Sequence, residues 1–403
     1  MLHLNTPWLA LPALQQLFNL FEKEGATLRL VGGSVRDGLL DLPVSDIDLA
    51  VDRDPLWVMK LLKSHHIKAI PTGIDHGTIT AVLDKRPYQI TTLRVDVKTF
   101  GRKAHVAFTD DWVQDAYRRD FTMNAIYADK NGHLFDPVGG VEDLKNHVVR
   151  FIGDASQRIK EDYLRILRFF RFSARFGHEP YNEEGLQACA QYASHLPHLA
   201  RERVTEEFLK LLEFPSPLYA LQAMEETGVL AYILHLSSWE PLRALVSLEK
   251  EGGFPPSPCI RLAAFHPALE EIKAHLRLSG KQQAILAFLL KNHKPVTHAS
   301  FKHQAYLWGK EKTFDLALFQ TAHRLALSEL SFTEGIVFLK ELHTLFDFWN
   351  VPSFPLTGHD ILEQGVTEGT AVGALLKTVE TWWISKDLEP DHEACLAYLS
   401  TLL

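Results

Sequence analysis

The sequence lacks any uninterrupted apolar run of about 18 residues, the length that a membrane-spanning helix needs. Its first residues, MLHLNTPWLALPALQQ, have neither a basic start nor a small-residue cleavage site. The chain has 3 cysteines, far apart and without a CxxC pair, so neither a disulfide framework nor a structural zinc site is expected. We therefore expect a cytoplasmic protein without a membrane partner.

Basic residues are in the minority, with 42 Lys and Arg against 50 Asp and Glu and a formal net charge of -8. This balance alone argues against a nucleic-acid partner, because phosphate binding rests on Lys and Arg. Residues 158–175 have the opposite balance, with more basic than acidic residues. The acids are Glu161 and Asp162, and the basic residues are Arg158, Lys160, Arg165, Arg168, Arg171 and Arg175. Taken alone, such a segment is equally well explained as a solvated helix face.

The order of local patterns predicts two regimes of structure. Up to about residue 150, short runs of branched residues (28–31, 46–51, 78–83 and 88–93) alternate with helical segments, and beyond it helical patterns follow one another. The turn segment DPVGGVEDL separates the two regimes. We therefore expect an α/β N-terminal head over residues 1–145, a helical neck over 146–212, and an all-α C-terminal body and tail over 213–403.

The segment LVGGSVRDGLLDLPVSDIDLAVD, residues 30–52, combines a glycine turn with two closely spaced acids. Gly32 and Gly33 follow a strand and precede Arg36 at a helix start, where backbone N–H groups are free to hold phosphate oxygens. Asp46 and Asp48 lie two residues apart in a strand, so their carboxylates point to one face. Either feature alone is more often structural. Together they predict a Mg²⁺ pair carrying a nucleoside triphosphate, because such close carboxylates repel each other unless a cation lies between them.

A capping-box pattern at residues 154–157 predicts one long helix that ends near Gly177. In it, Asp162, Arg165 and Arg168 are spaced three apart and share a face. An Asp beside an Arg presents an acceptor and a donor, as the edge of a base does, and could select a nucleotide without a template. The alternative is an ordinary ion pair within the helix.

These motifs resemble the polymerase-β-like superfamily, and in particular the class II tRNA nucleotidyltransferase and bacterial poly(A) polymerase family. The resemblance covers about residues 28–212 and rests on these segments in order: GGSVRD with DID, HGTITAV, YQITTLRVD, RRDFTMNAIYAD, DPVGG, EDYLRILRFFRFSARFG and RVTEEFLKLL. It implies a nucleotidyltransferase head with a mixed sheet. It also implies Mg²⁺ as the cofactor, tRNA, ATP and CTP as partners, and a helical body that holds the tRNA.

By the same resemblance, Arg119, Asp120 and Asn124 line the nucleotide pocket, whereas Asp162 and Arg165 discriminate CTP and ATP. The favoured activity is CCA addition to the 3′ end of tRNA. Poly(A) polymerase is disfavoured, because the basic segment after the DxD strand and the long basic tail of that group are not evident. An enzyme of this family that adds only CC or only A is a remaining alternative. The sequence indicates no oligomeric state.

One departure from the family concerns Gln89, where a glutamate is usual. An amide cannot bind a metal as an anion. A third carboxylate, if one is required, must come from elsewhere, with Asp96 and Asp84 as candidates, or catalysis must proceed on Asp46 and Asp48 with water. A catalytically idle RNA-binding relative is therefore a further alternative. The Gly358-His359-Asp360 sequence is reminiscent of metal-dependent phosphohydrolases, but we expect a turn and a helix start there.

Overall fold

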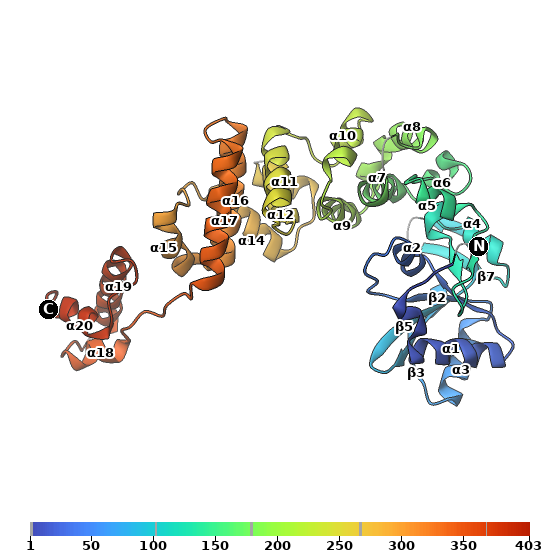
Figure 1. The fold of residues 1–403 in the computed structure, drawn as a ribbon, viewed down its shortest axis with the longest axis horizontal. Coiled ribbons are helices and arrows are strands. Elements are labelled where there is room, and N and C mark those ends of the chain that lie inside the picture. The colour runs from blue at the N-terminus through green and yellow to red at the C-terminus, as the bar shows by residue number, and fades with distance from the viewer. Residues whose placement is uncertain (1–2, 101–102, 178–179, 266–267, 368) are drawn as a thin grey trace. The chain divides into compact units, whose positions relative to one another are not determined.

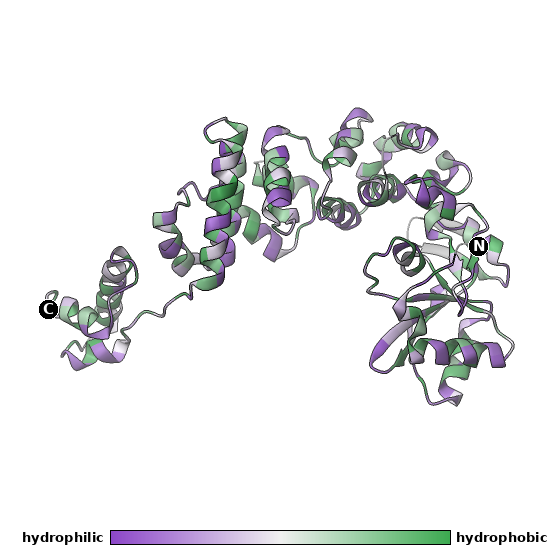
Figure 2. Cartoon of the chain, in the orientation of Figure 1, coloured by the Kyte–Doolittle hydropathy of each residue, from purple (hydrophilic) through white to green (hydrophobic). Residues whose placement is uncertain are grey.

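The computed structural model describes residues 3–100, 103–177, 180–265, 268–367 and 369–403, with the side chains of all of these except 96–100 and 103–105 (Figure 1). The chain forms two compact units, Met1–His235 and Leu236–Leu403. Within the described ranges, no helix is long and apolar enough to cross a membrane. In both units most helices carry hydrophilic and hydrophobic residues together, as expected where one face packs and the other meets solvent (Figure 2).

The first unit contains a seven-stranded sheet in the order β3-β4-β5-β2-β1-β8-β9. The strands are β1 Leu28–Val31, β2 Asp48–Val51, β3 Lys68–Gly73, β4 Thr78–Leu83, β5 Arg86–Thr92, β8 Tyr127–Ala128 and β9 Leu134–Phe135. Only the pair β2 and β5 is parallel, so the predicted mixed sheet is confirmed. A separate hairpin is formed by β6 Arg94–Phe100 and β7 Lys103–Phe108.

Two helices cover part of this sheet, α1 Pro12–Lys23 and α3 Pro55–Ser64. They lie side by side (Figure 1), and the rings of Phe21 and Trp57 meet edge to face at 5.9 Å. The start of α3 is fixed locally, because the Asp54 carboxylate accepts hydrogen bonds from the N–H groups of Leu56 and Trp57, and Pro55 has no N–H to satisfy.

Shorter helices follow the strands. They are α2 Gly33–Leu39, α4 Trp112–Tyr117 and α5 Gly140–Lys145. Single 3₁₀ turns occur at Pro7–Ala10, Ile74–His76, Thr122–Asn124, Ala193–His198 and Leu230–Tyr232. The turn between β1 and α2 depends on Gly32, whose φ of 72° and ψ of -130° are accessible to glycine and strained for other residues.

The helical part of the first unit consists of α6 Ala155–Glu161, α7 Leu164–Phe176, α8 Glu183–Tyr192, α9 Arg201–Leu212 and α10 Leu218–Glu226. The prediction of one continuous helix to Gly177 was wrong. Asp162 adopts an extended conformation, with φ -155° and ψ 106°, and separates α6 from α7. Its carboxylate accepts from the backbone N–H of Leu164, the first residue of α7, so it contacts the start of the second helix.

The second unit is helical in its described residues. It contains α11 Glu240–Gly252, α12 Pro258–Phe265, α13 Leu269–His275, α14 Gly280–Lys291, α15 His298–Trp308, α16 Lys310–Ala326, α17 Phe332–Phe348, α18 Gly358–Glu363, α19 Gly369–Ser385 and α20 His392–Ser400. Inside it, Arg261 and Glu249 form an ion pair of 2.6 Å whose side chains are 1% and 2% exposed. A separate apolar cluster surrounds the buried Trp383 near the C-terminal end.

The Gly358-His359-Asp360 sequence begins α18, as expected. The Asp360 carboxylate accepts from the N–H and hydroxyl of Thr357, which closes a capping box, and it also contacts His392. Among the described residues, no three His, Cys, Asp or Glu side chains form a group that could hold a metal ion. The hydrolase interpretation therefore has no structural support in this part of the chain.

Candidate active site

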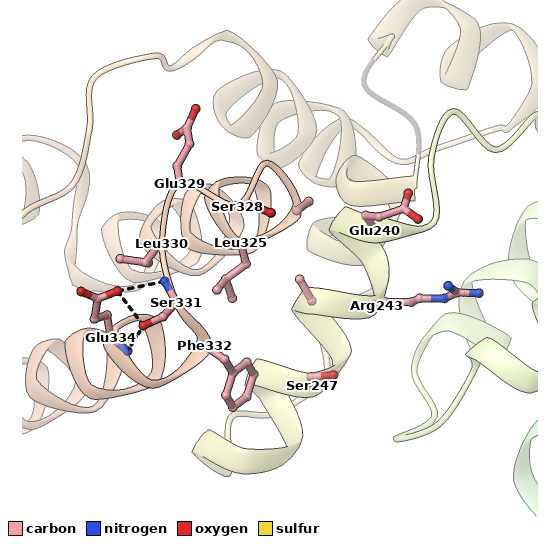
Figure 3. Close-up of a pocket in the computed structure, with 12 residues that line it drawn as sticks. Glu240, Arg243, Ser247, Leu325, Ser328, Glu329, Leu330, Ser331, Phe332 and Glu334 are labelled. Carbon is pink, nitrogen blue, oxygen red and sulfur yellow. Dashed lines mark hydrogen bonds between the residues drawn. The ribbon is translucent and has the colours of Figure 1, made fainter.

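A hollow in the second unit is unsuited to a nucleotide. It lies between α11 and the segment that joins α16 to α17 (Figure 3), and its apolar side chains include Leu325 and Phe332. Glu240, Glu329 and Glu334 lie around it with one cation, Arg243. Three carboxylates against one guanidinium would repel a triphosphate. We therefore place the candidate site elsewhere.

A second pocket, of about 400 Å³ in the first unit, gathers residues from four separate segments. It is lined by Gly32, Gly33, Arg36, Asp48, Arg118, Arg119, Asp120, Asn124, Asp162, Arg165, Arg168 and Phe172. These include every predicted site residue except Asp46, which lies outside the lining. Arg118 and Phe172 were not among the predicted site residues. The position of Phe172 four residues after Arg168, one helical turn further, is the signal that could have revealed it.

The two acids of the DID segment differ in their surroundings. Asp46 is exposed and accepts a hydrogen bond from the Ser45 hydroxyl at 3.0 Å, whereas Asp48 is partly buried at the start of β2. Burial raises the pKa of the Asp48 carboxyl, the negative charge of Asp46 raises it further, and Arg119 opposes both. Asp46 thus acts electrostatically on Asp48, but β2 begins at Asp48, so the prediction that both acids lie in one strand was wrong for Asp46.

Gln89 is aligned with Asp48 on the neighbouring strand β5 and is exposed. The amide therefore stands beside the acidic pair, where a third carboxylate would complete it. Asp84 lies in the turn between β4 and β5, outside the pocket lining, and does not supply one there. The side chain of Asp96 lies outside the described part of the chain.

A chain of hydrogen bonds crosses the pocket wall from α2 to α7. Arg36 donates to the Asn124 amide oxygen at 2.6 Å, and the Asn124 amide donates to Asp120 at 3.0 Å. Arg168 donates to the other Asp120 oxygen at 2.7 Å. Burial alone would raise the pKa of Asp120, but Arg168 and Asn124 hold it far below its usual range. Asp120 is therefore an anion that fixes its neighbours.

Asp162 and Arg165 are not paired with each other as the simple ion-pair interpretation requires. Arg165 binds Glu161 at 2.6 Å and the carbonyl of Arg158 at 2.9 Å. Asp162 binds Arg203 of α9 at 2.6 Å. Each of the two side chains is thus held by its own partner while both line the pocket, an arrangement that suits recognition of a ligand between them.

Phe172 provides an aromatic surface in the same wall. The guanidinium groups of Arg36 and Arg168 each lie 5.2 Å from the centre of its ring, and that of Arg171 lies at 4.4 Å. Stacking on a ring restrains a guanidinium without consuming its N–H donors. The pocket thus combines restrained cations, a partly buried acid and a glycine turn.

Comparison with known proteins assigns the family. Residues 28–150 match the poly A polymerase head domain, and residues 182–240 match the probable RNA and SrmB-binding site of polymerase A. The mitochondrial CCA tRNA nucleotidyltransferase 1 of Homo sapiens is 35% identical over 96% of this chain and 89% of its own length. The chain belongs to the CCA tRNA nucleotidyltransferase family.

Bacterial relatives agree with this family assignment. The CCA-adding enzyme of Bacillus cytotoxicus is 30% identical over 94% of this chain and 95% of its own. The crystal structure of the Bacillus stearothermophilus CCA-adding enzyme in complex with CTP has a TM-score of 0.73 and 26% identity, covering 97% of each chain. Nucleotidyltransferases of this family generally use divalent metal ions.

Proposed function

We propose that this protein adds C, C and A to the 3′ end of tRNA from CTP and ATP without a template. The observation that carries this function is the convergence in one pocket of Asp48, the glycine turn and the pair Asp162 and Arg165. The first two serve phosphoryl chemistry, and the pair offers an acceptor and a donor to a base edge. A nucleotide pocket that also contains its own selecting groups needs no template strand.

Asp46 and Asp48 are the proposed catalytic residues and the proposed ligands of Mg²⁺. The residues fit such a cation, because the ionised Asp48 is disfavoured by burial and by its acidic neighbour, and a divalent ion would relieve both penalties. When bound, the metal supplies charge that activates the tRNA 3′-hydroxyl and neutralises the leaving pyrophosphate. The Gln89 amide can add a neutral oxygen ligand but no charge.

The nucleotide is proposed to bind across the whole pocket. Gly32 and Gly33 offer backbone N–H groups to phosphates, and Arg119 offers a guanidinium. Arg36, Asp120, Asn124 and Arg168 then form the connected wall on which ribose and phosphates rest. The tRNA is proposed to bind the helical part of the chain. The functional division at residues 145 and 212, and a cytoplasmic location, stay predictions.

The decisive experiment incubates the purified protein with tRNA lacking its 3′ CCA, Mg²⁺ and each labelled nucleotide. Incorporation of C and then A is expected. Addition of A alone to any RNA would instead identify a poly(A) polymerase, and CC alone or A alone on tRNA would identify a specialist. Binding of tRNA without incorporation would identify an idle relative.

Three variants test the proposed metal ligands. Asp46→Ala and Asp48→Ala are each expected to abolish incorporation while circular dichroism and melting stay close to the parent protein. Asp110→Ala removes an exposed aspartate of the same unit outside the pocket lining and is expected to stay active. Full activity in either of the first two variants would refute the assignment.

A further inference from the structure

Asp115, in α4, is an acid that the reaction outlined above does not use. Its side chain is 1% exposed and lies behind the pocket wall, outside the lining residues. A buried carboxylate costs several kcal/mol by order of magnitude unless its charge is matched. Its place in the fold therefore depends on what it binds.

The Asp115 carboxylate accepts five hydrogen bonds. One oxygen accepts from the backbone N–H of Arg94 at 3.2 Å and from Nε of Arg118 at 2.9 Å. The other accepts from Nε and Nη2 of Arg119 at 3.2 and 3.1 Å and from the Tyr127 hydroxyl at 2.7 Å. Both arginines line the nucleotide pocket, so one hidden anion holds two of its cations.

Asp115 binds two of the three guanidinium nitrogens of Arg119, so only Nη1 is directed elsewhere. Nε and Nη2 are directed to Asp115, whereas Nη1 makes a long contact of 3.4 Å with the carbonyl of Asn124. This same Nη1 lies 3.7 Å from the position that a Cβ on Gly32 would take. Nη1 of Arg119 thus lies beside the glycine turn, where phosphate oxygens are proposed to lie.

The two arginines hold Asp115 as an anion. Burial works against ionisation of Asp115, but Arg119 and Arg118 lower its pKa to about 2. Nε and Nη2 of Arg119 are thereby committed to Asp115.

We infer that Asp115 is a positioning residue, which directs Arg118 and Arg119 toward the nucleotide phosphates. This inference rests on the proposed function, because it takes the pocket to hold a nucleoside triphosphate. It concerns no contact between Asp115 and the substrate. Asp115 acts only through the two arginines that it binds.

Simple electrostatics predicts the opposite result from positioning. Replacing Asp115 by Asn removes a negative charge near the pocket, which by Coulomb's law should strengthen the binding of a triphosphate. Positioning predicts weaker CTP binding. The N–H donors of the Asn amide would face the N–H donors of Arg119, and the Arg119 side chain would lose its fixed orientation. The sign of the change in CTP affinity therefore distinguishes the two mechanisms.

The experiment compares four forms of the full chain by calorimetric titration with CTP and with CMP in Mg²⁺. The forms are the parent protein, Asp115→Asn, Tyr127→Phe and Glu249→Gln. Tyr127→Phe removes one hydrogen bond to Asp115 and keeps the charge, so it tests the same idea in a variant expected to fold. Glu249→Gln is the matched control, because it disturbs an equally buried acid paired with an arginine in the other unit.

Asp115→Asn is expected to weaken CTP binding by about tenfold, since charge-assisted hydrogen bonds of this kind are lost. Its affinity for CMP, which lacks the outer phosphates, should change by less than about twofold. Tyr127→Phe should show a smaller loss of CTP affinity, of about two- to threefold. Glu249→Gln should leave both affinities unchanged. In incorporation kinetics, Asp115→Asn should raise KM for CTP more than it lowers kcat.

Equal or tighter CTP binding by Asp115→Asn would overturn the inference, and so would equal losses for CTP and CMP. A loss matched by Glu249→Gln would overturn it too, because the effect would then be one of stability. If the parent protein binds CTP but incorporates nothing, the proposed function fails while the titrations still decide the role of Asp115. If the parent protein binds no CTP, both fail.

Discussion

Replacing Arg203 by Met should make nucleotide choice less strict. Arg203 of α9 donates to Asp162 at 2.6 Å, and the two side chains are 12% and 19% exposed. The other Asp162 oxygen accepts from the Leu164 N–H at 3.2 Å. Methionine keeps much of the length and the helix propensity of the side chain but removes the charge. Asp162 would then lose its ion pair with Arg203 and keep only the hydrogen bond from Leu164.

The magnitude follows from these two contacts. A hydrogen bond to a charged group is worth about 1.5 to 3 kcal/mol, and breaking a fully buried ion pair costs about 3 to 5 kcal/mol. Because Asp162 keeps some access to solvent, we expect a stability loss of about 2 kcal/mol. One well-placed base contact contributes about 1 to 3 kcal/mol of discrimination. Loss of half the restraint on Asp162 should therefore reduce selectivity by about tenfold.

The assay measures kcat/KM for single additions of CTP, ATP, UTP and GTP to a tRNA lacking its 3′ end. We expect the ratio of correct to incorrect nucleotides to fall in Arg203→Met. The control is Arg261→Met, which breaks the buried pair with Glu249 in the second unit. It should lower the melting temperature and leave the ratio intact. Unchanged selectivity in Arg203→Met, at a similar loss of stability, would refute a selecting role for Asp162.

Three further changes test other parts of the molecule. Gln89→Glu, beside Asp48, should lower the Mg²⁺ concentration for half-maximal incorporation several-fold; an unchanged metal titration would contradict this. Gly32→Ala should cost about 1 to 3 kcal/mol in a denaturant titration and weaken CTP binding, because φ is 72° there. Burial and the charge of Glu311 raise the pKa of Asp315 to about 6, so the folded protein favours the protonated carboxyl. The stability that this protonation contributes is present at low pH and is lost as pH rises through 6. Asp315→Asn should therefore stabilise the protein by on the order of 2 kcal/mol at pH 8 and by less than half of that at pH 4.5, by chemical denaturation; equal effects at both would contradict it.

The head was predictable where local pattern and packing agree. The predicted strands at 28–31 and 78–83 coincide with β1 and β4, whose branched residues are mostly buried. The acidic strand begins at Asp48 instead of residue 46, because only Asp48 and the residues after it pair with β1 and β5. Strand ends depend on a partner strand, which a single sequence pattern does not contain.

The pocket itself followed from resemblance more than from local pattern. Spacing alone predicted that Asp162, Arg165 and Arg168 share one helix face, yet Asp162 lies in an extended link between two helices. No Gly or Pro marks that break in the sequence. It is stabilised by Arg203, a residue 41 positions further along the chain. The three residues line the same pocket, although the helical geometry assumed for them was wrong.

Most arginines of the basic segment, residues 158–175, are neutralised by acids of the same unit. Arg165 binds Glu161, Arg171 binds Glu207, and Arg175 binds Asp37. Arg158 and Arg168 have acidic partners as well. Cations that are paired and partly buried in this way cannot provide an exposed surface for an RNA backbone. The local excess of basic residues over α6 and α7 therefore belongs mainly to the pocket wall, with the exposed Lys160 as an exception. At a net charge of -8, we expect tRNA to be held largely by groups outside this segment.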